Sequence, residues 1–210
     1  MTRGKLITFE GGEGSGKSTQ VVLLAESFAK AGIKAIKTRE PGGVDSAERI
    51  REILVKGDAA LNPVTEILLN FAARSEHLQK LMLPELAAGN YVICDRFVDS
   101  TMAYQGFGHG VSAAYIEIFK NLVVGNFTPD LTILLDVDVE EGLSRASSRG
   151  DKENRFEKMG KDFHRRLRDG FIEIAKKEPE RFAVIDAAKP KEIVRKKVLE
   201  AVNKKLGISL

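Results

Sequence analysis

The sequence predicts an α/β protein: a five-stranded parallel sheet flanked by helices in three layers. Short segments rich in β-branched and other apolar residues alternate with longer segments of helical periodicity. A glycine-rich stretch joins the first strand-like segment to the first helical one. The strand-like segments are Lys5–Glu10, Ala35–Thr38, Tyr91–Asp95, Leu131–Val137 and Phe182–Asp186.

Local signals set the ends of several helices. Asn62-Pro63 is a typical cap and first-turn pair, and we expect Pro84 to end or kink the helix that follows. Residues 145–161 are rich in basic residues and contain few apolar ones, which predicts a mobile surface segment, here called the lid. The helical segments that can be bounded are Thr19–Lys30, Asn62–Leu83 and Ser112–Val124.

Composition narrows the class of protein. The 210 residues contain no linker or low-complexity tract, so we expect one domain over 1–210. A net charge of +3 is too small and dispersed to indicate a nucleic-acid or membrane-surface partner. The single cysteine, Cys94, cannot form an internal disulfide, no leader-like segment precedes the first strand, and no apolar stretch approaches a membrane span. We therefore expect a cytoplasmic protein.

The glycine-rich stretch matches the phosphate-binding loop (P-loop) pattern G-x-x-x-x-G-K-[ST]. Glycines let backbone N–H groups converge on phosphate oxygens, and the following helix adds its dipole. Lys17 is expected to reach the β- and γ-phosphates of ATP and Ser18 to ligate Mg²⁺, with Thr19 as a neighbouring contact. The predicted ATP-binding loop is Gly11, Gly12, Glu13, Gly14, Ser15, Gly16, Lys17 and Ser18.

The sequence has no Asn-Lys-x-Asp guanine clamp, which argues against a GTP-dependent switch. It does carry Phe9-Glu10-Gly11, Thr38-Arg39-Glu40-Pro41-Gly42-Gly43, Phe71-Ala72-Ala73-Arg74, Cys94-Asp95-Arg96, Ser100-Thr101-Met102-Ala103-Tyr104-Gln105-Gly106 and Pro129-Asp130-Leu131. In this order the motifs resemble those of bacterial thymidylate kinases over nearly the whole chain. The resemblance implies phosphoryl transfer from ATP to dTMP, a Mg²⁺ cofactor and a homodimer.

An acceptor nucleotide brings a dianionic phosphate that must face the γ-phosphate, so cations are needed opposite the P-loop. Arg39 and Arg96 follow predicted strands at the sheet edge where ligands gather. The resemblance assigns both to the dTMP phosphate region, together with Arg51, Glu40 and Pro41. It also assigns Asp95 to the ordering of Mg²⁺ and its waters.

An acid within an anion-binding loop indicates a function for Glu13, because its charge opposes phosphate binding. In the resembled family this residue faces the 3′-hydroxyl of the acceptor. Gly14 stands where some members carry an arginine, and members with glycine there supply an arginine from the lid. Arg155 is the expected catalytic arginine, and Arg149 is the second candidate.

Thymine recognition requires a stacking ring and hydrogen-bond donors. The resemblance assigns the ring to Phe71 and donation to thymine O4 to Arg74. Phe71 lies three residues before Arg74, whereas in many members the aromatic lies four before it, where Asn70 stands here. The remaining residues implied near the base and deoxyribose are Ser100, Thr101, Tyr104 and Gln105.

The resemblance places adenine between Arg145 and residues 186–190. His77, His109 and His164 lack ligand-like spacing, so no zinc site is expected. Two alternatives stay open: a nucleoside monophosphate kinase for dUMP or a cytidylate, and a sensor that binds ATP without transferring phosphate. The residues assigned to an acceptor nucleotide, above all the arginines, argue against the sensor, because a protein that only binds ATP has no need for them.

Overall fold

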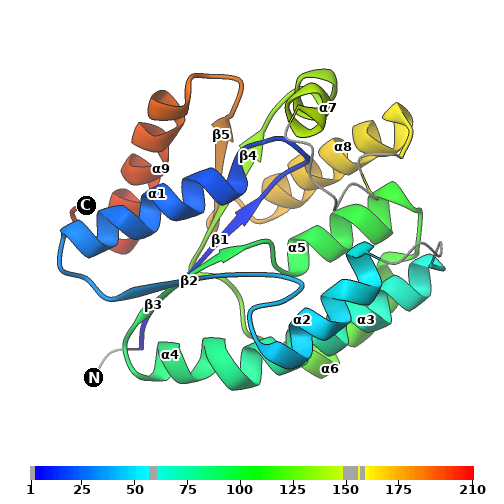
Figure 1. Ribbon diagram of the computed structural model, residues 1–210, viewed down its shortest axis with the longest axis horizontal. Coiled ribbons are helices and arrows are strands. Elements are labelled where there is room, and N and C mark those ends of the chain that lie inside the picture. Colours follow the sequence, from blue (N-terminus) through cyan, green and yellow to red (C-terminus); the bar gives the residue numbers. More distant parts are fainter. Residues whose placement is uncertain (1–2, 57–60, 149–155, 157–158) are drawn as a thin grey trace.

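The computed structural model describes residues 3–56, 61–148, 156 and 159–210. Five strands form one parallel sheet in the order β2-β3-β1-β4-β5 (Figure 1). Every expected strand is confirmed to within one residue at each end. The strands are β1 (Leu6–Glu10), β2 (Ala35–Arg39), β3 (Tyr91–Asp95), β4 (Leu131–Asp136) and β5 (Phe182–Asp186).

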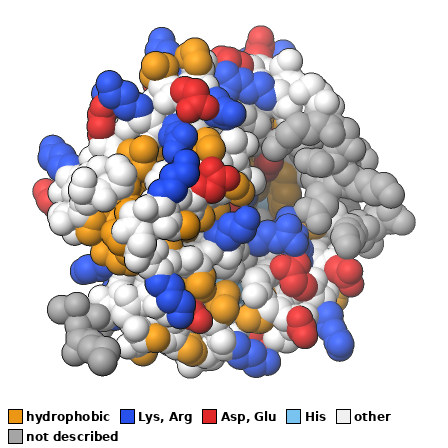
Figure 2. Space-filling model, turned by 60° about the vertical axis from the view of Figure 1, so that its left-hand side comes forward, with side chains coloured by type: hydrophobic (Ala, Val, Ile, Leu, Met, Phe, Trp, Pro, Cys, Tyr) orange, Lys and Arg blue, Asp and Glu red, His pale blue; other side chains and the backbone are white. Residues whose placement is uncertain are grey.

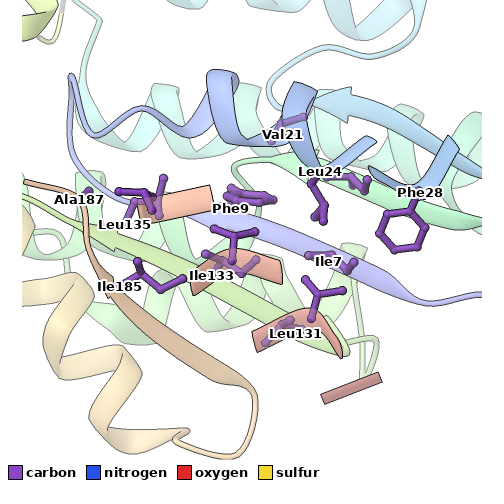
Figure 3. Packing of buried hydrophobic residues seen from close by; sticks show 14 of the residues in the cluster. Ile7, Phe9, Val21, Leu24, Phe28, Leu131, Ile133, Leu135, Ile185 and Ala187 are labelled. Carbon is purple, nitrogen blue, oxygen red and sulfur yellow. The ribbon is translucent and has the colours of Figure 1, made fainter. Parts of the chain in front are cut away.

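Helices cover both faces of the sheet, which confirms the expected three layers (Figure 1). The helices α1 (Lys17–Lys30) and α9 (Lys191–Leu206) pack over one face, where Phe9, Phe28 and Ile133 belong to a fully buried cluster (Figure 3). The other face is covered by α3 (Pro63–His77), α4 (Leu83–Ala87) and α6 (Ala113–Val123). Neighbouring residues of one strand serve opposite layers, since Ile93 packs in the first cluster and Cys94 in the second.

A third apolar cluster joins β4 to α8 (Lys161–Lys177) and to the π-helical segment η3 (Met102–Gly108). The remaining elements are α2 (Asp45–Arg51), η1 (Glu52–Lys56), η2 (Leu78–Met82), α5 (Val98–Thr101) and α7 (Val139–Ser147). No helix among the described residues is both long and apolar enough to cross a membrane.

The ends of the α3 region show how local signals act. Asn62 caps α3 as expected, because its Oδ1 accepts a hydrogen bond from the Val64 backbone N–H at 2.9 Å. Pro84 does not end the helical segment: the chain passes through the π-helical turn η2 into α4, which reaches Ala87. Pro84 follows directly on this π-helical turn, whose wider i→i−5 hydrogen bonding accommodates a residue without an N–H.

The sheet brings the site together at its carboxyl edge. Asp95, the last residue of β3, is in register with Phe9 of β1 and with Arg39 of β2. The chain stays joined just beyond the strands, where the Glu40 N–H donates to Asp95 O and the Arg96 N–H to Phe9 O, both at 2.9 Å. Residues that follow three different strands therefore reach one location.

Candidate active site

A cleft of about 440 Å³ opens at the carboxyl ends of β1, β2 and β3, between the P-loop, α3 and η3. In Figure 2 the surface is hollowed beside a group of Lys and Arg side chains. The predicted site residues that line the cleft are Glu13, Gly14, Gly16, Lys17, Ser18, Arg39, Glu40, Pro41, Arg51, Arg74, Asp95, Arg96, Ser100, Thr101, Tyr104 and Gln105. Residues from both predicted sets, for ATP phosphates and for dTMP, thus line one cavity.

The P-loop connects β1 to α1 as a compact turn. Gly14 has a φ of 67°, and a Cβ at this position would meet the Gly142 carbonyl oxygen of α7 at 1.9 Å. No side chain fits there, so an arginine at position 14 is excluded by packing. The Lys17 ammonium lies within the loop, donating to Gly11 O at 3.0 Å and Gly12 O at 2.7 Å.

The surroundings of the P-loop disfavour the charged form of Lys17. Burial, and then the neighbouring positive charge of Arg96, lowers the pKa of Lys17 from 10.5 to about 8. A bound anion would favour the charged ammonium and reverse this shift. The loop is therefore built to receive negative charge.

Ser18 and Asp95 form the hydroxyl and carboxylate pair expected of a magnesium site. The Ser18 hydroxyl donates to Asp95 Oδ2 at 2.6 Å. Among the described residues no group of three or more His, Cys, Asp or Glu side chains could hold a metal. A single hydroxyl beside a single carboxylate suits a Mg²⁺ that takes its other ligands from phosphate and water.

Arg96 follows β3 with a φ of 70°, the one non-glycine residue with positive φ among those the structure describes. This conformation costs about 1–2 kcal/mol, so the fold must hold it in place. Its guanidinium donates to Gly11 O and Glu13 Oε1, each at 3.1 Å, and to Ser100 Oγ at 3.2 Å. The backbone strain aims a cation into the space between the P-loop and η3.

Glu13 is ionised by its neighbours. Burial alone would raise its pKa, but the charges of Arg96 and Lys17 and a hydrogen bond from the Tyr104 hydroxyl lower it to about 2. The Tyr104 Oη lies 2.5 Å from Glu13 Oε1. Glu13 therefore presents a carboxylate, a hydrogen-bond acceptor, to the cleft at neutral pH.

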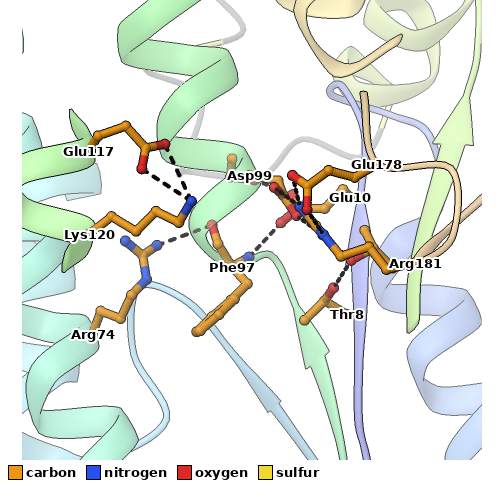
Figure 4. Close-up of polar contacts among 11 residues, drawn as sticks. Thr8, Glu10, Arg74, Phe97, Asp99, Glu117, Lys120, Glu178 and Arg181 are labelled. Carbon is orange, nitrogen blue, oxygen red and sulfur yellow. Dashed lines mark hydrogen bonds and ion pairs between the residues drawn. The ribbon is translucent and has the colours of Figure 1, made fainter. Parts of the chain in front are cut away.

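Glu10, three residues earlier, lies below the cleft floor and is fully buried. It accepts hydrogen bonds from the Phe97 N–H at 2.7 Å and from the Ser100 hydroxyl at 2.5 Å (Figure 4). Burial, and then the nearby Asp99 carboxylate, raises the pKa of Glu10 to about 8. Glu10 thus ties down the segment that follows Arg96, although sequence reasoning gave it no role.

The other two cations of the predicted phosphate region are Arg39, the last residue of β2, and Arg51, the last residue of α2. Arg39 donates to Glu48 Oε2 at 3.0 Å, and Glu48 Oε1 accepts from the Gly43 N–H at 2.9 Å. Arg51 donates to Pro41 O at 2.9 Å. Both arginines line the cleft at the side opposite the P-loop.

Arg74 is the centre of a buried polar network on α3. Its Nε donates to Glu40 Oε2 at 2.7 Å, and its two terminal nitrogens donate to Thr101 Oγ1. Nη2 also donates to Phe97 O, the contact drawn in Figure 4. Counted over the described residues, these four hydrogen bonds engage four of its five N–H groups and leave one on Nη1. A single donor therefore stays available to a ligand in the cleft.

The network continues away from the cleft through His77, which is 0% exposed. His77 Nδ1 lies 3.1 Å from Glu40 Oε1, and His77 Nε2 lies 2.7 Å from Thr38 Oγ1. Glu40 therefore uses both carboxylate oxygens on protein side chains. Its role is to hold Arg74 rather than to bind a ligand by itself.

The position of Phe71 does not support the stacking role expected for it. Phe71 is 2% exposed and packs in the apolar cluster under α3, with its ring centroid 6.1 Å from that of Phe119. Asn70 lines the cleft instead. Asn70 and Arg74 are four residues apart and share a helix face, whereas Phe71 is rotated towards the core.

Arg145 of α7 contacts the loop after β5 directly, and the adenine position expected between them stays a prediction. Its guanidinium donates to Ala187 O at 2.8 Å and Ala188 O at 3.3 Å, and it pairs with Glu141. Arg145 does not line the 440 Å³ cleft, nor do Gly11, Gly12, Ser15 and Thr19. Arg149 and Arg155 lie outside the described residues, so their predicted roles have no structural counterpart here.

Sequence reasoning missed several residues of the site. Val55, Asn70, Phe97 and Phe156 line the cleft, and Glu10, Glu66 and His77 support it from below. Asn70 could have been found from its spacing to Arg74 along a helix. The buried groups carry no such signal, because they are recognised only by the partners that the fold brings to them.

A parallel α/β sheet, a P-loop at the end of its first strand and a cleft with opposed cationic groups define a P-loop nucleotide phosphotransferase. The family model described as "Thymidylate kinase" matches residues 9–198. The chain belongs to the thymidylate kinase family.

Individual relatives agree with this assignment. A thymidylate kinase of Caulobacter vibrioides is 49% identical over 209 residues, covering 99% of this chain and 100% of the relative. One from Pseudomonas fluorescens SBW25 is 51% identical over 188 residues, covering 89% of each chain. The crystal structure of thymidylate kinase from Ehrlichia chaffeensis superposes with a TM-score of 0.80 at 36% identity, covering 95% of this chain and 99% of that one.

Proposed function

We propose that this chain catalyses its family's reaction, transfer of the γ-phosphoryl group of ATP to dTMP, by direct in-line transfer within the described cleft. The observation that carries the proposal is one cavity lined by the P-loop, by Arg96 bound against that loop, and by Arg39 and Arg51 on other elements. Two nucleotides with facing phosphates require such an arrangement, and no covalent intermediate is needed.

At the phosphate end, Lys17 exchanges its contacts with Gly11 O and Gly12 O for oxygens of the ATP phosphates. Arg96 is placed between the P-loop and η3, where it can neutralise charge on the acceptor phosphate. Glu13 accepts a hydrogen bond from the 3′-hydroxyl of dTMP, and Arg39 and Arg51 bind the acceptor phosphate from the opposite side.

Ser18 and Asp95 would hold the Mg²⁺ that accompanies ATP, partly through water. When bound, the ion neutralises charge on the β- and γ-phosphates. The protein's own part is to keep the Ser18 hydroxyl and the Asp95 carboxylate within hydrogen-bond reach of each other at the start of α1.

At the base end, Arg74 donates its remaining N–H to thymine O4, while Thr101 and Gln105 border the base. Tyr104, held by Glu13, packs under the deoxyribose and leaves no room for a 2′-hydroxyl. Phe97 and Asn70, which line the cleft, replace Phe71 as the residues in contact with the ring.

An arginine of the lid completes the transition-state charge, with Arg155 the first candidate and Arg149 the second. Because Gly14 leaves no space for a side chain, the cation cannot come from the P-loop at that position. Arg155→Ala is expected to lower kcat more than it weakens ATP binding, since the interaction forms in the transition state. Unchanged turnover would transfer the role to Arg149 or elsewhere.

A panel of nucleoside monophosphates in an ADP-release assay tests the function directly. dTMP is expected to give the highest kcat/KM, above dUMP and the cytidylates. ADP release that does not depend on any monophosphate would favour the sensor, and preference for a cytidylate would identify another monophosphate kinase.

A homodimer remains our proposal for the assembly. Phe71 of α3 and Ile116 of α6 are buried, but the same two helices expose other apolar side chains. They are Val64 and Leu68 of α3 and Tyr115, Ile118 and Leu122 of α6, and the two helices contact each other. Sedimentation of the protein at several concentrations would measure the oligomeric state.

A cytoplasmic location and a single domain over 1–210 likewise stay predictions.

A further inference from the structure

A buried glutamate stands directly behind the base end of the cleft. Glu66 of α3 is 0% exposed and lies one turn before Asn70 and two turns before Arg74, on the same helix face. Its Oε2 accepts a hydrogen bond from Gln105 Nε2 at 2.8 Å, and His109 Nε2 lies 3.8 Å from the same oxygen. Glu66 does not line the cleft, whereas Gln105 does.

The contact between Glu66 and Gln105 decides which way the Gln105 amide faces. A carboxylate only accepts hydrogen bonds, so the NH₂ group of the amide must point to Glu66 and the carbonyl oxygen away from it. Gln105 Oε1 accepts no hydrogen bond from the described residues and is not sealed from solvent. Gln105 therefore turns its carbonyl oxygen, an acceptor, away from Glu66 and towards the cleft, while at least one of its two amide N–H groups is engaged by Glu66.

We propose that Glu66 determines base selectivity by holding Gln105 so that its carbonyl oxygen receives the N3–H of thymine. This inference rests on the proposed binding of dTMP in this cleft. Thymine and uracil present N3–H as a donor and O4 as an acceptor, which match Gln105 Oε1 and the free N–H of Arg74. Cytosine presents an acceptor at N3 and an amino donor at C4. Its N3 would therefore face another acceptor, Gln105 Oε1, and its amino group another donor, the Arg74 N–H.

The energetic reason is the cost of leaving buried polar groups unmatched. Gln105 and Arg74 are both 2% exposed, so water cannot compensate a mismatched base. A site built to hydrogen-bond one pattern rejects the reversed pattern far more strongly than it rejects a missing methyl group. A rotation of the Gln105 amide would let the site accept cytosine, and Glu66 prevents this rotation because it accepts a hydrogen bond from the amide nitrogen.

Glu66→Gln tests this step because an amide at position 66 can pair with Gln105 in either orientation. We expect kcat/KM for dTMP to fall only about twofold, as half of the molecules keep the original orientation. For dCMP it should rise about tenfold, because the flipped amide donates to cytosine N3. The ratio of dTMP to dUMP, which differ only in the 5-methyl group, should stay the same.

A purely structural role for Glu66 would lower kcat/KM for all three substrates in the same proportion and lower the melting temperature. That result would overturn the proposal. If the wild-type enzyme did not phosphorylate dTMP at all, the proposed function itself would fail, which is a different outcome.

Gln105→Met provides a second route that leaves Glu66 in place. Removing the acceptor should lower kcat/KM for dTMP and dUMP together by about tenfold and bring dCMP closer to them. An unchanged dTMP to dCMP ratio in both single variants, with dTMP still phosphorylated, would show that Gln105 does not read N3.

Discussion

The two ends of the cleft are built differently. At the base end, three polar side chains are buried: Arg74 is paired with Glu40, and Gln105 donates to Glu66. At the phosphate end, the Arg39 side chain is 51% exposed, and Ser18 meets Asp95 at the surface. The base end is therefore fixed by contacts within the folded protein, whereas the phosphate end combines the buried Lys17 with Arg39, Ser18 and Asp95, which stay accessible to ligands.

The difference has an electrostatic cause. A buried polar group must be matched inside the protein, because unmatched desolvation is costly. Cations that are to bind phosphate must instead be able to exchange partners, and Lys17 already has its pKa lowered to about 8 by burial and by Arg96. The comparison predicts that substitutions at the phosphate end lower turnover strongly, whereas substitutions at the base end weaken the binding of dTMP.

Arg96→Ala should have the largest effect. Removing a cation aimed between the P-loop and η3 is expected to lower kcat for dTMP by at least about 100-fold. The melting temperature should also fall, because Arg96 donates to Gly11 O, Glu13 Oε1 and Ser100 Oγ, so kcat is compared at a temperature where both proteins are folded. The matched control is Arg165→Ala on α8, an exposed arginine paired with Asp162, which should retain wild-type kinetics.

Wild-type turnover in Arg96→Ala would remove this residue from the mechanism. An equal loss in both arginine variants would point to a general effect of net charge rather than to the phosphate end of the cleft.

Substitutions of His77 test the base end, because His77 contacts the Glu40 carboxylate that holds Arg74. The amide nitrogen of Asn stands as many bonds from Cβ as His Nδ1, and that of Gln as many as His Nε2. His77→Asn should therefore keep the contact with Glu40, and His77→Gln should keep only the contact with Thr38. Losing a hydrogen bond to the carboxylate that holds Arg74 should raise KM for dTMP about tenfold in the Gln variant.

KM for ATP should stay unchanged in both His77 variants, and the Asn variant should bind dTMP nearly as the wild type does. Steady-state kinetics with each substrate varied in turn measures this difference. A similar loss in the two variants, or a parallel rise in KM for ATP, would show that His77 supports the fold generally and not Arg74.

The same contrast explains what could be predicted from the sequence. The strands, the P-loop and the arginines that follow β2 and β3 carry local signals, because each depends on periodicity, glycine content or a strand end. Phe71 was expected in the site for its chemistry, but helix geometry turns it to the core and brings Asn70 to the cleft. His77, Glu10 and Glu66 have no local signal, since their partners lie on other elements and only the fold brings them together.

Glu10 links the two ends of the cleft and should produce the smallest effect, on stability. Its carboxyl accepts from the Phe97 N–H (Figure 4) and from the Ser100 hydroxyl, two residues that line the cleft, and the charge of Arg96 acts on it. Burial and Asp99 raise its pKa to about 8, from 4.5. Between these two values the folded protein holds a proton that the unfolded chain has released, so stability falls as pH rises through this window.

Glu10→Gln removes this proton while keeping an acceptor for Phe97 and gaining a donor to Ser100. The melting temperature of the wild type should fall by a few °C more than that of the variant between about pH 5 and pH 8. Glu13, whose pKa is lowered to about 2, loses its contribution only below this window, and Lys17 titrates above it. The lowered pKa of His164 acts in the opposite direction but is common to both proteins. Parallel melting curves across the window would mean that Glu10 is already ionised in the folded enzyme, with Arg96 as its counter-charge.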